Sequence, residues 1–146
     1  MSYTSVEDAL RTLLQAVTGY STANVTEGDY RILGTGQTKA MVLQPGAFRR
    51  TNSAPGIQIT DWTANIELFI PFKDEISTVA SDIRTERAAI IAQLDAYPTL
   101  NRTSGVLMGA IESGDEPEVW AVGSRRWWRQ LMRVTIKEQS LVATSE

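Results

Sequence analysis

The chain has 146 residues, of which 42% are hydrophobic and 21% are charged, and its net charge is −3 at pH 7. These values predict one soluble globular domain over residues 1–146, because no apolar run approaches the roughly 20 residues that a membrane span needs. The chain contains no histidine and no cysteine. Disulfides are therefore excluded, and the side chains most used for catalysis at neutral pH and for metal binding are missing. We expect a protein that is not an enzyme and holds no metal or cofactor.

The charged residues are unevenly distributed along the chain. Eleven of the 14 basic residues are arginine, with adjacent pairs at 49–50 and 125–126, and acidic residues gather at 115–118. Arginine is enriched at protein interfaces because its guanidinium binds carboxylates bidentately and stacks on aromatic rings. The acidic balance argues against a dedicated nucleic-acid binder. These clusters are either solvated surface or parts of a protein interface.

The first predicted element is an amphipathic helix over residues 5–18. Thr4 and Glu7 have the spacing of a capping box, and apolar residues recur at helical intervals until Gly19 ends the pattern. The polar face of this helix is not polybasic. We therefore expect it to pack on the core of the domain and not on a membrane surface.

Residues 20–56 are rich in Gly, Thr, Asn and Pro. Short strand-like runs at 30–33 and 40–43 predict a hairpin around the glycine-containing turn between them. Residues 44–56 predict a long flexible loop, because turn formers accompany two arginines and the exposed-looking Phe48. Such loops are often functional, which makes this one a candidate contact arm.

A long strand and a long helix follow. Alternation of apolar and polar residues over 62–72 predicts a half-buried strand that Pro71 ends. After a turn at 73–75, apolar residues recur at helical spacing over 76–96. Pro98 then stops the helix, because proline disfavours helical geometry in the residue before it.

The C-terminal part predicts three more strands. They cover 106–112, 119–122 and 126–138, and the acidic turn at 113–118 separates the first two. Residues 139–146 show no pattern and predict a flexible tail. Helices and strands in this order indicate an α+β fold.

The last predicted strand has two different faces. Trp128 is in register with the apolar residues that follow it, which predicts that it is buried. Trp127, Arg129 and Arg133 then lie on the other face, and an exposed Trp beside Arg is typical of an interface hot spot. Interleaved arginines and aromatics also suit nucleic-acid binding, which remains an alternative. The candidate interface residues are Phe48, Arg49, Arg50, Asp115, Glu116, Glu118, Trp127, Arg129 and Arg133.

No catalytic constellation is visible in the sequence. The acidic turn at 115–118 lacks the alternating ligand spacing of a calcium loop. Glycoside chemistry would need an acid and base such as Glu67 and Glu75, and nothing in the sequence sets the separation that this chemistry requires.

The sequence resembles the tail-terminator and tail-completion proteins of long-tailed bacteriophages. The resemblance spans about residues 5–138 and lies in the order of the elements and in the segments TANIELFIPF, IRTERAAIIAQLDAYPTLN and RRWWRQLMRVTIKE. It implies a single-domain α+β fold in which an antiparallel or mixed sheet is flanked by two helices. It also implies a structural virion protein of the tail and neck, assembled in the host cytoplasm.

Copies of such a protein form a ring, usually a hexamer, on the last ring of the tail tube. The ring ends tail polymerisation and provides the surface that joins the head. The implied partners are the tail tube protein and the head connector or neck protein, without a membrane. The resemblance leaves open whether DNA in the ring lumen touches the protein.

A ring needs a heterologous contact between copies. We expect the basic pair at 49–50 to meet the acidic turn at 115–118 across a subunit boundary or across the joint to the next ring. Two alternatives remain. One is a head-completion or connector-side neck protein, whose ring is commonly twelvefold. The other is a small ligand-binding or regulatory domain with a pocket around Trp127.

Overall fold

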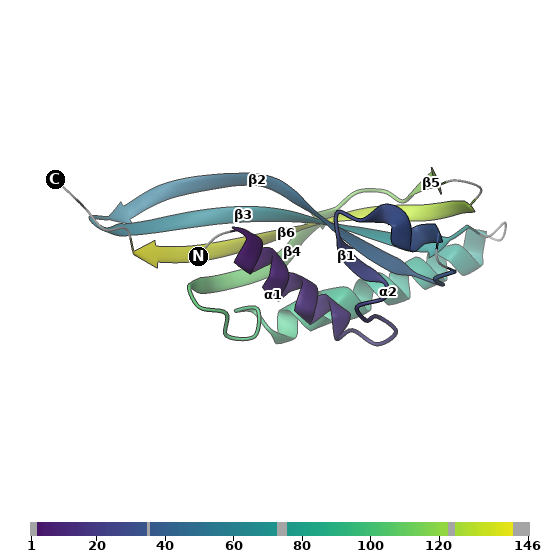
Figure 1. Cartoon of the computed structure of the whole chain (residues 1–146), viewed down its shortest axis with the longest axis horizontal. Coiled ribbons are helices and arrows are strands. Elements are labelled where there is room, and N and C mark those ends of the chain that lie inside the picture. The colour runs from purple at the N-terminus through teal and green to yellow at the C-terminus, as the bar shows by residue number, and fades with distance from the viewer. Residues whose placement is uncertain (1–2, 35, 73–75, 123–124, 142–146) are drawn as a thin grey trace.

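The computed structural model describes residues 3–34, 36–72, 76–122 and 125–141, and all six strands in these ranges belong to one mixed sheet (Figure 1). In chain order the elements are α1 (Tyr3–Gln15), β1 (Val25–Glu27), the 3₁₀-helix η1 (Tyr30–Gly34), β2 (Ala40–Ala54), β3 (Ile57–Pro71), α2 (Ile76–Ala96), β4 (Val106–Gly114), β5 (Glu118–Val122) and β6 (Arg125–Leu141). The strand order is β1-β2-β3-β6-β4. Only the β1–β2 pair among these strands is parallel. The predicted α+β class is confirmed, and the sheet is of the mixed kind.

β6 organises one side of the sheet. It pairs with β3 from Trp127, opposite Pro71, to Leu141, opposite Ile57. Its other edge carries β5 along its first part and β4 along its second part. β4 and β5 therefore lie end to end on the same edge.

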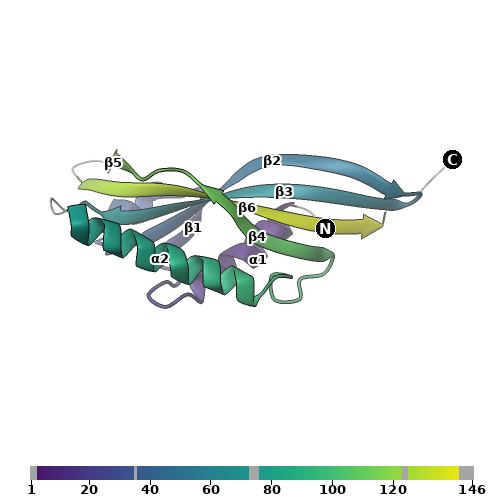
Figure 2. The same cartoon turned by 180° about the vertical axis from the view of Figure 1, so that it is seen from behind.

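Both α-helices pack against one face of the sheet, which we call the helix face (Figures 1 and 2). Side chains alternate along a strand, so every second residue of β3 and β6 contributes to this core. Its buried strand residues include Ala64, Ile66, Leu68, Ile70, Met132, Val134 and Ile136. The helices contribute Val6, Leu10, Leu13, Leu14, Val79, Ile83, Ile90 and Leu94. The expectation that two helices flank the sheet is thus corrected to two helices on the same side.

The opposite face, which we call the open face, has a smaller core at one end. Leu33, Ala40, Val42, Phe69 and Trp127 are buried there, with Tyr30, Ile32 and Trp120 packed against them. η1 and β5 supply the cover at this end. Toward the other end, β2 and β3 project beyond the helices (Figure 1).

The two helix predictions have different outcomes. The helix predicted over 76–96 is confirmed as α2. α1 begins at Tyr3 and ends at Gln15, earlier at both ends than predicted. Thr4 therefore lies inside the helix and is not its N-cap. The chain leaves α1 through i→i+3 bonds, such as Val17 N to Leu14 O at 3.2 Å, which tighten the last turn.

The predicted hairpin between 30–33 and 40–43 is wrong. Tyr30–Gly34 forms η1, which begins where Asp29 Oδ1 accepts a hydrogen bond from the Arg31 backbone N–H at 3.0 Å. This Asx turn offers the backbone a local alternative to a strand. β2 pairs in parallel with β1, a strand that the sequence did not predict.

The predicted flexible loop over 44–56 is also wrong, since most of it is the second half of β2. Pro45 and Gly46 lie at a register shift between Pro45 and Phe48, and proline is tolerated at edges and bulges because no ladder N–H is needed there. Gly56 makes the turn into β3 with φ of 74°. The proline and glycine residues of this segment thus lie at a bulge and a turn of a long hairpin. Composition alone predicted a loop.

The strand predictions hold with longer bounds. β3 begins five residues before the predicted start at Trp62, and Pro71 ends it as expected. β6 extends to Leu141, so residues 139–141 of the predicted tail are strand. Residues 142–146 of that tail and the turn at 73–75 lie outside the described residues.

Candidate functional site

Two strands at opposite sides of the sheet, β2 and β4, lack a neighbouring strand along part of their outer edges in the described chain. The edge of β4 is partly covered, because the Gly109 backbone N–H donates to the Pro98 carbonyl at 2.6 Å. After Leu43, where the pairing with β1 ends, β2 has no strand on its outer side within the described chain. β4 likewise pairs with β6 alone among the described strands. Unpaired edges present backbone donors and acceptors to another chain, and proteins usually shield them with charges, bulges or a partner.

The first edge carries a hairpin arm, defined as residues 46–63 of β2 and β3. Every side chain from Ala47 to Ala54 is exposed. Phe48 is 61% exposed and packs against Trp62, with ring centroids 5.4 Å apart and the rings tilted by 43°. A large apolar residue on an open strand edge stands out, because edges are normally protected by polar residues.

The register places the predicted basic residues on different faces of the arm. Phe48 and Arg50 lie opposite Trp62 and Thr60, on the helix face, whereas Arg49 lies opposite Asp61 on the open face. Arg50 hydrogen-bonds Gln58. Arg49 forms no ion pair with a described residue. The arm thus presents an aromatic residue on one side and a free cation on the other.

The predicted acidic turn is largely neutralised within the chain. Asp115 accepts two hydrogen bonds from Arg133, at 2.8 and 3.1 Å, and this bidentate pair lowers the pKa of Asp115 and raises that of Arg133. Glu118 accepts one from Arg129 at 2.7 Å. Glu116 is exposed. The structure therefore brings together two pairs of the predicted interface residues, Asp115 with Arg133 and Glu118 with Arg129.

The prediction that Trp127 is exposed is wrong. Trp127 is fully buried in the smaller core, where it packs edge to face on Phe69 with centroids 6.4 Å apart. The Arg125 guanidinium lies 4.5 Å from the Trp127 ring centroid. Trp128 is half-buried against the main core, on the predicted face. The predicted alternation of faces along β6 is correct, but η1 and β5 cover the face on which Trp127 was expected to be exposed.

A buried polar network on the open face was not predicted. Glu67 is 3% exposed and accepts hydrogen bonds from the Tyr30 hydroxyl at 2.6 Å and from Arg129 Nε at 2.9 Å. Gln44 Nε2 donates to the Tyr30 hydroxyl oxygen at 2.8 Å. Burial, and then the hydrogen bond to Glu67, raises the pKa of Tyr30. One feature of the sequence could have indicated this network. Glu67 and Arg129 are charged residues of opposite sign that lie within two predicted strands.

The Glu67 carboxylate, which the sequence offered as an acid or base, is engaged in contacts within the chain. The Glu67 carboxylate is held by Tyr30 and Arg129, and Glu75, its proposed partner in glycoside chemistry, lies outside the described residues. No group of three or more acidic, His or Cys side chains in the described ranges has a metal-binding arrangement. Neither described helix is long and apolar enough to cross a bilayer.

Comparison with protein-family models and with curated protein sequences returns no match. Among solved structures, one protein whose name describes no activity aligns with 100% of this chain and 99% of its own. The two sequences are 14% identical, and the TM-score is 0.42. A similarity this low carries no argument about function.

Proposed function

We propose that this protein is a structural subunit of a bacteriophage tail, which assembles as a ring on the end of the tail tube and terminates its polymerisation. The observation that carries the proposal is the pair of free edges on opposite sides of one sheet. One copy offers the outer edge of β2, and its neighbour offers the outer edge of β4. The sequence resemblance to tail-terminator proteins supplies the biological setting.

The two edges suit a ring because they differ from each other. A contact between unlike surfaces is heterologous, and it generates a closed ring when the rotation between copies closes. Pairing of strand edges gives main-chain hydrogen bonds, and side chains such as Phe48 and Arg49 set the register. In this proposal the Arg49-Arg50 pair protects the edge of the free subunit and becomes part of the contact in the ring.

The ring would bind the tail tube protein on one side and the head connector or neck protein on the other. Two helices cover the helix face, whereas the open face is covered at one end only (Figures 1 and 2). The two faces therefore differ in shape. Such unlike faces fit a subunit that joins two different partners. The proposed location is therefore the tail and neck of the virion.

The test is tail assembly in its presence and absence. Purified tail tube protein should polymerise without limit alone and stop at ring-capped ends when this protein is added, as seen by electron microscopy. A sixfold ring on tube ends supports the terminator function. A twelvefold ring that binds the head connector and ignores tube ends would assign the protein to the connector side, and tubes of unchanged length with no bound protein would refute the proposal.

A further inference from the structure

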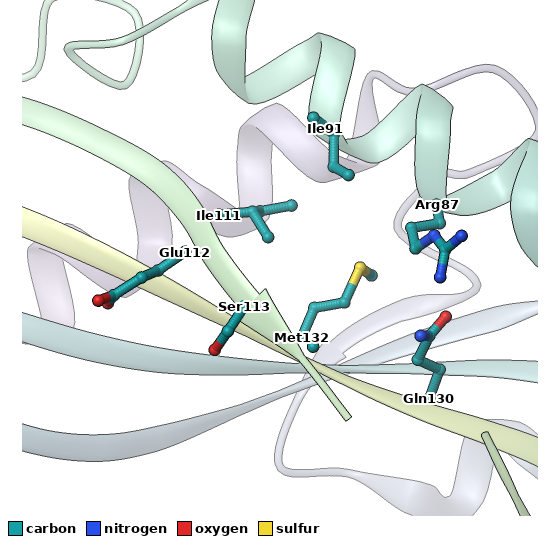
Figure 3. Close-up of a pocket in the computed structure, with 8 residues that line it drawn as sticks. Arg87, Ile91, Ile111, Glu112, Ser113, Gln130 and Met132 are labelled. Carbon is teal, nitrogen blue, oxygen red and sulfur yellow. The ribbon is translucent and has the colours of Figure 1, made fainter. Parts of the chain in front are cut away.

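A cavity of about 230 Å³ lies between α2 and the end of β4 (Figure 3). The apolar side chains of Ile91, Ile111 and Met132 form part of its wall, and Arg87 and Gln130 close one end. Glu112, Ser113 and Gly114 border it along β4. A closed apolar cavity of roughly 150 Å³ holds a benzene molecule, so this space accommodates an aromatic side chain. We call it the socket. Residues 111–114 at the end of β4 thus form one border of the socket.

One buried polar atom at the socket, Gln130 Oε1, has no hydrogen-bond partner among the described residues. Gln130 is 4% exposed, and its Nε2 donates to the Asp115 carbonyl at 3.0 Å. This bond fixes the amide orientation, so Oε1 points toward Arg87 across the end of the socket (Figure 3), where it has no hydrogen-bond donor in the described chain. Arg87 also forms no ion pair with a described residue. Buried polar atoms are nearly always satisfied, so this arrangement favours an incoming group.

Phe48 lies on the correct face of the sheet to reach this socket. Phe48 pairs with Trp62, Trp62 with Ile136, and Ile136 with Gly109, so all four residues share the helix face. Ile111, two residues beyond Gly109, points to the same face. If the β2 edge of one copy continues the sheet at the β4 edge of another, Phe48 projects on the helix face of that copy, which is the face of Ile111 and the socket.

The charges on the other face are also complementary. Arg49 points to the open face, opposite to Phe48. Glu112 lies at the bulge of β4 and is exposed, and its carboxylate reaches Thr135 on the open face. It forms no ion pair with a described residue, in contrast to Asp115 and Glu118. Glu112 is therefore a better partner for Arg49 than the two neutralised residues of the acidic turn.

The geometry points to a specific contact between copies: Phe48 of one copy fills the socket of a second copy, and Arg49 of the first pairs with Glu112 of the second. The two interactions contact the edge of β4 on both faces of the sheet, and together they fix one register of strand pairing between the copies. This inference rests on the proposed ring and names the surfaces that build it.

Cysteine crosslinking tests the contact directly, because the natural chain has no cysteine. The variant with Arg50→Cys and Ile91→Cys keeps Phe48 and should form ladders of covalent oligomers with a short bis-maleimide, because Arg50 shares the face of Phe48. The matched control carries Arg50→Cys and Ala89→Cys, since Ala89 is exposed and lies two positions before Ile91 on a different side of α2. Ladders in the first variant alone are expected. Equal ladders in both, or none in either, would overturn the contact.

A charge exchange provides the second test and does not depend on crosslinking. Arg49→Glu and Glu112→Arg should each weaken self-association, and combining them in one chain should restore it. Phe48→Asp should weaken it by about thirtyfold, as expected for an interface hot spot. Circular dichroism checks that each variant is folded, which is expected because all three positions are exposed. Independent effects of the two charge reversals, without restoration, would contradict the pairing.

The outcomes separate this inference from the proposed function. If the folded Phe48→Asp variant still forms rings that cap tail tubes, the contact is wrong and the function stands. If the crosslink forms but wild-type rings do not bind tube ends, the contact stands and the function is wrong. A wild-type chain that stays monomeric at high concentration and in the presence of tube ends contradicts both.

Discussion

Glu67 and Arg129 form a buried ion pair across β3 and β6, with Glu67 Oε2 and Arg129 Nε 2.9 Å apart. The side chain of Glu67 is 4% exposed and that of Arg129 is 21% exposed. The pair links η1, through Tyr30, to β5, through Glu118. It therefore holds the cover of the smaller core onto the sheet.

Removing one partner of a buried pair leaves the other without compensation. We predict that Glu67→Ala lowers the free energy of unfolding by about 3 kcal/mol in urea titrations. Glu118→Gln is the matched control, because it removes an exposed partner of the same arginine and should cost less than about 1 kcal/mol. Similar losses of unfolding free energy in the two variants would show that burial of Glu67 does not increase the cost of breaking its ion pair.

Trp127→Ala should destabilise the monomer strongly. Truncating a fully buried Trp costs roughly 3 to 5 kcal/mol, because the cavity is only partly refilled. Trp120, which is half-buried over the same cluster, should cost less when changed to Ala. Thermal unfolding of both variants is the measurement. A Trp127→Ala variant with wild-type stability and impaired self-association would revive the exposed hot-spot interpretation.

Stability should fall as pH rises from about 4.5 to 7, and Glu27 should be a principal cause. Burial, followed by a hydrogen bond to Asp8, raises the pKa of Glu27 from 4.5 to about 7, against the opposing effect of Arg11. A carboxyl group with a raised pKa binds its proton more tightly in the folded state. Its stabilisation is complete below pH 4.5 and is lost as pH rises through 7.

Glu27→Gln removes this titration, so its unfolding free energy should change less than that of the wild type between these pH values. The charges facing the site are Glu7, Asp8 and Arg11, and all are retained in this variant. Urea titrations at pH 4.5, 6 and 7.5 make the comparison. Parallel curves for the two proteins would mean that Glu27 titrates normally.

Gly46→Ala should distort the base of the arm. A Cβ at Gly46 would lie 2.8 Å from the backbone oxygen of Thr63, which is too close for a carbon to fit without movement of the strand. We expect a loss of about 1 to 3 kcal/mol. Gly34→Ala is the control, since a Cβ there meets no atom within 4 Å. Equal melting temperatures for the two variants would contradict this account.

The parts of the fold that sequence predicted best are those with a long, uniform period. α2 and the core strands follow apolar spacings that are repeated over more than ten residues. The segment from Pro45 to Gly56 was predicted as a loop, but its proline and glycine residues lie at a bulge in β2 and at the tip of the β2–β3 hairpin. Local composition does not distinguish these uses of proline and glycine from a flexible loop.

The exposure of the candidate interface residues was predicted in part. Phe48 and Arg49 are exposed, as the turn-forming residues around them suggested. Exposure of this kind depends on the local sequence. Trp127 was misplaced because its cover comes from η1, whose residues lie about 95 positions earlier in the chain. The ion pairs that neutralise Asp115 and Glu118 likewise depend on strand register. Contacts of this kind follow from tertiary structure and leave little trace in a single sequence.

The most direct test of the account is the mass of the protein in solution, alone and on tail tubes, by native mass spectrometry and electron microscopy. The account predicts a closed ring of six copies, either free or assembled on tube ends, that Phe48→Asp disrupts. A protein that remains monomeric under both conditions, with Phe48→Asp indistinguishable from the wild type, would contradict it.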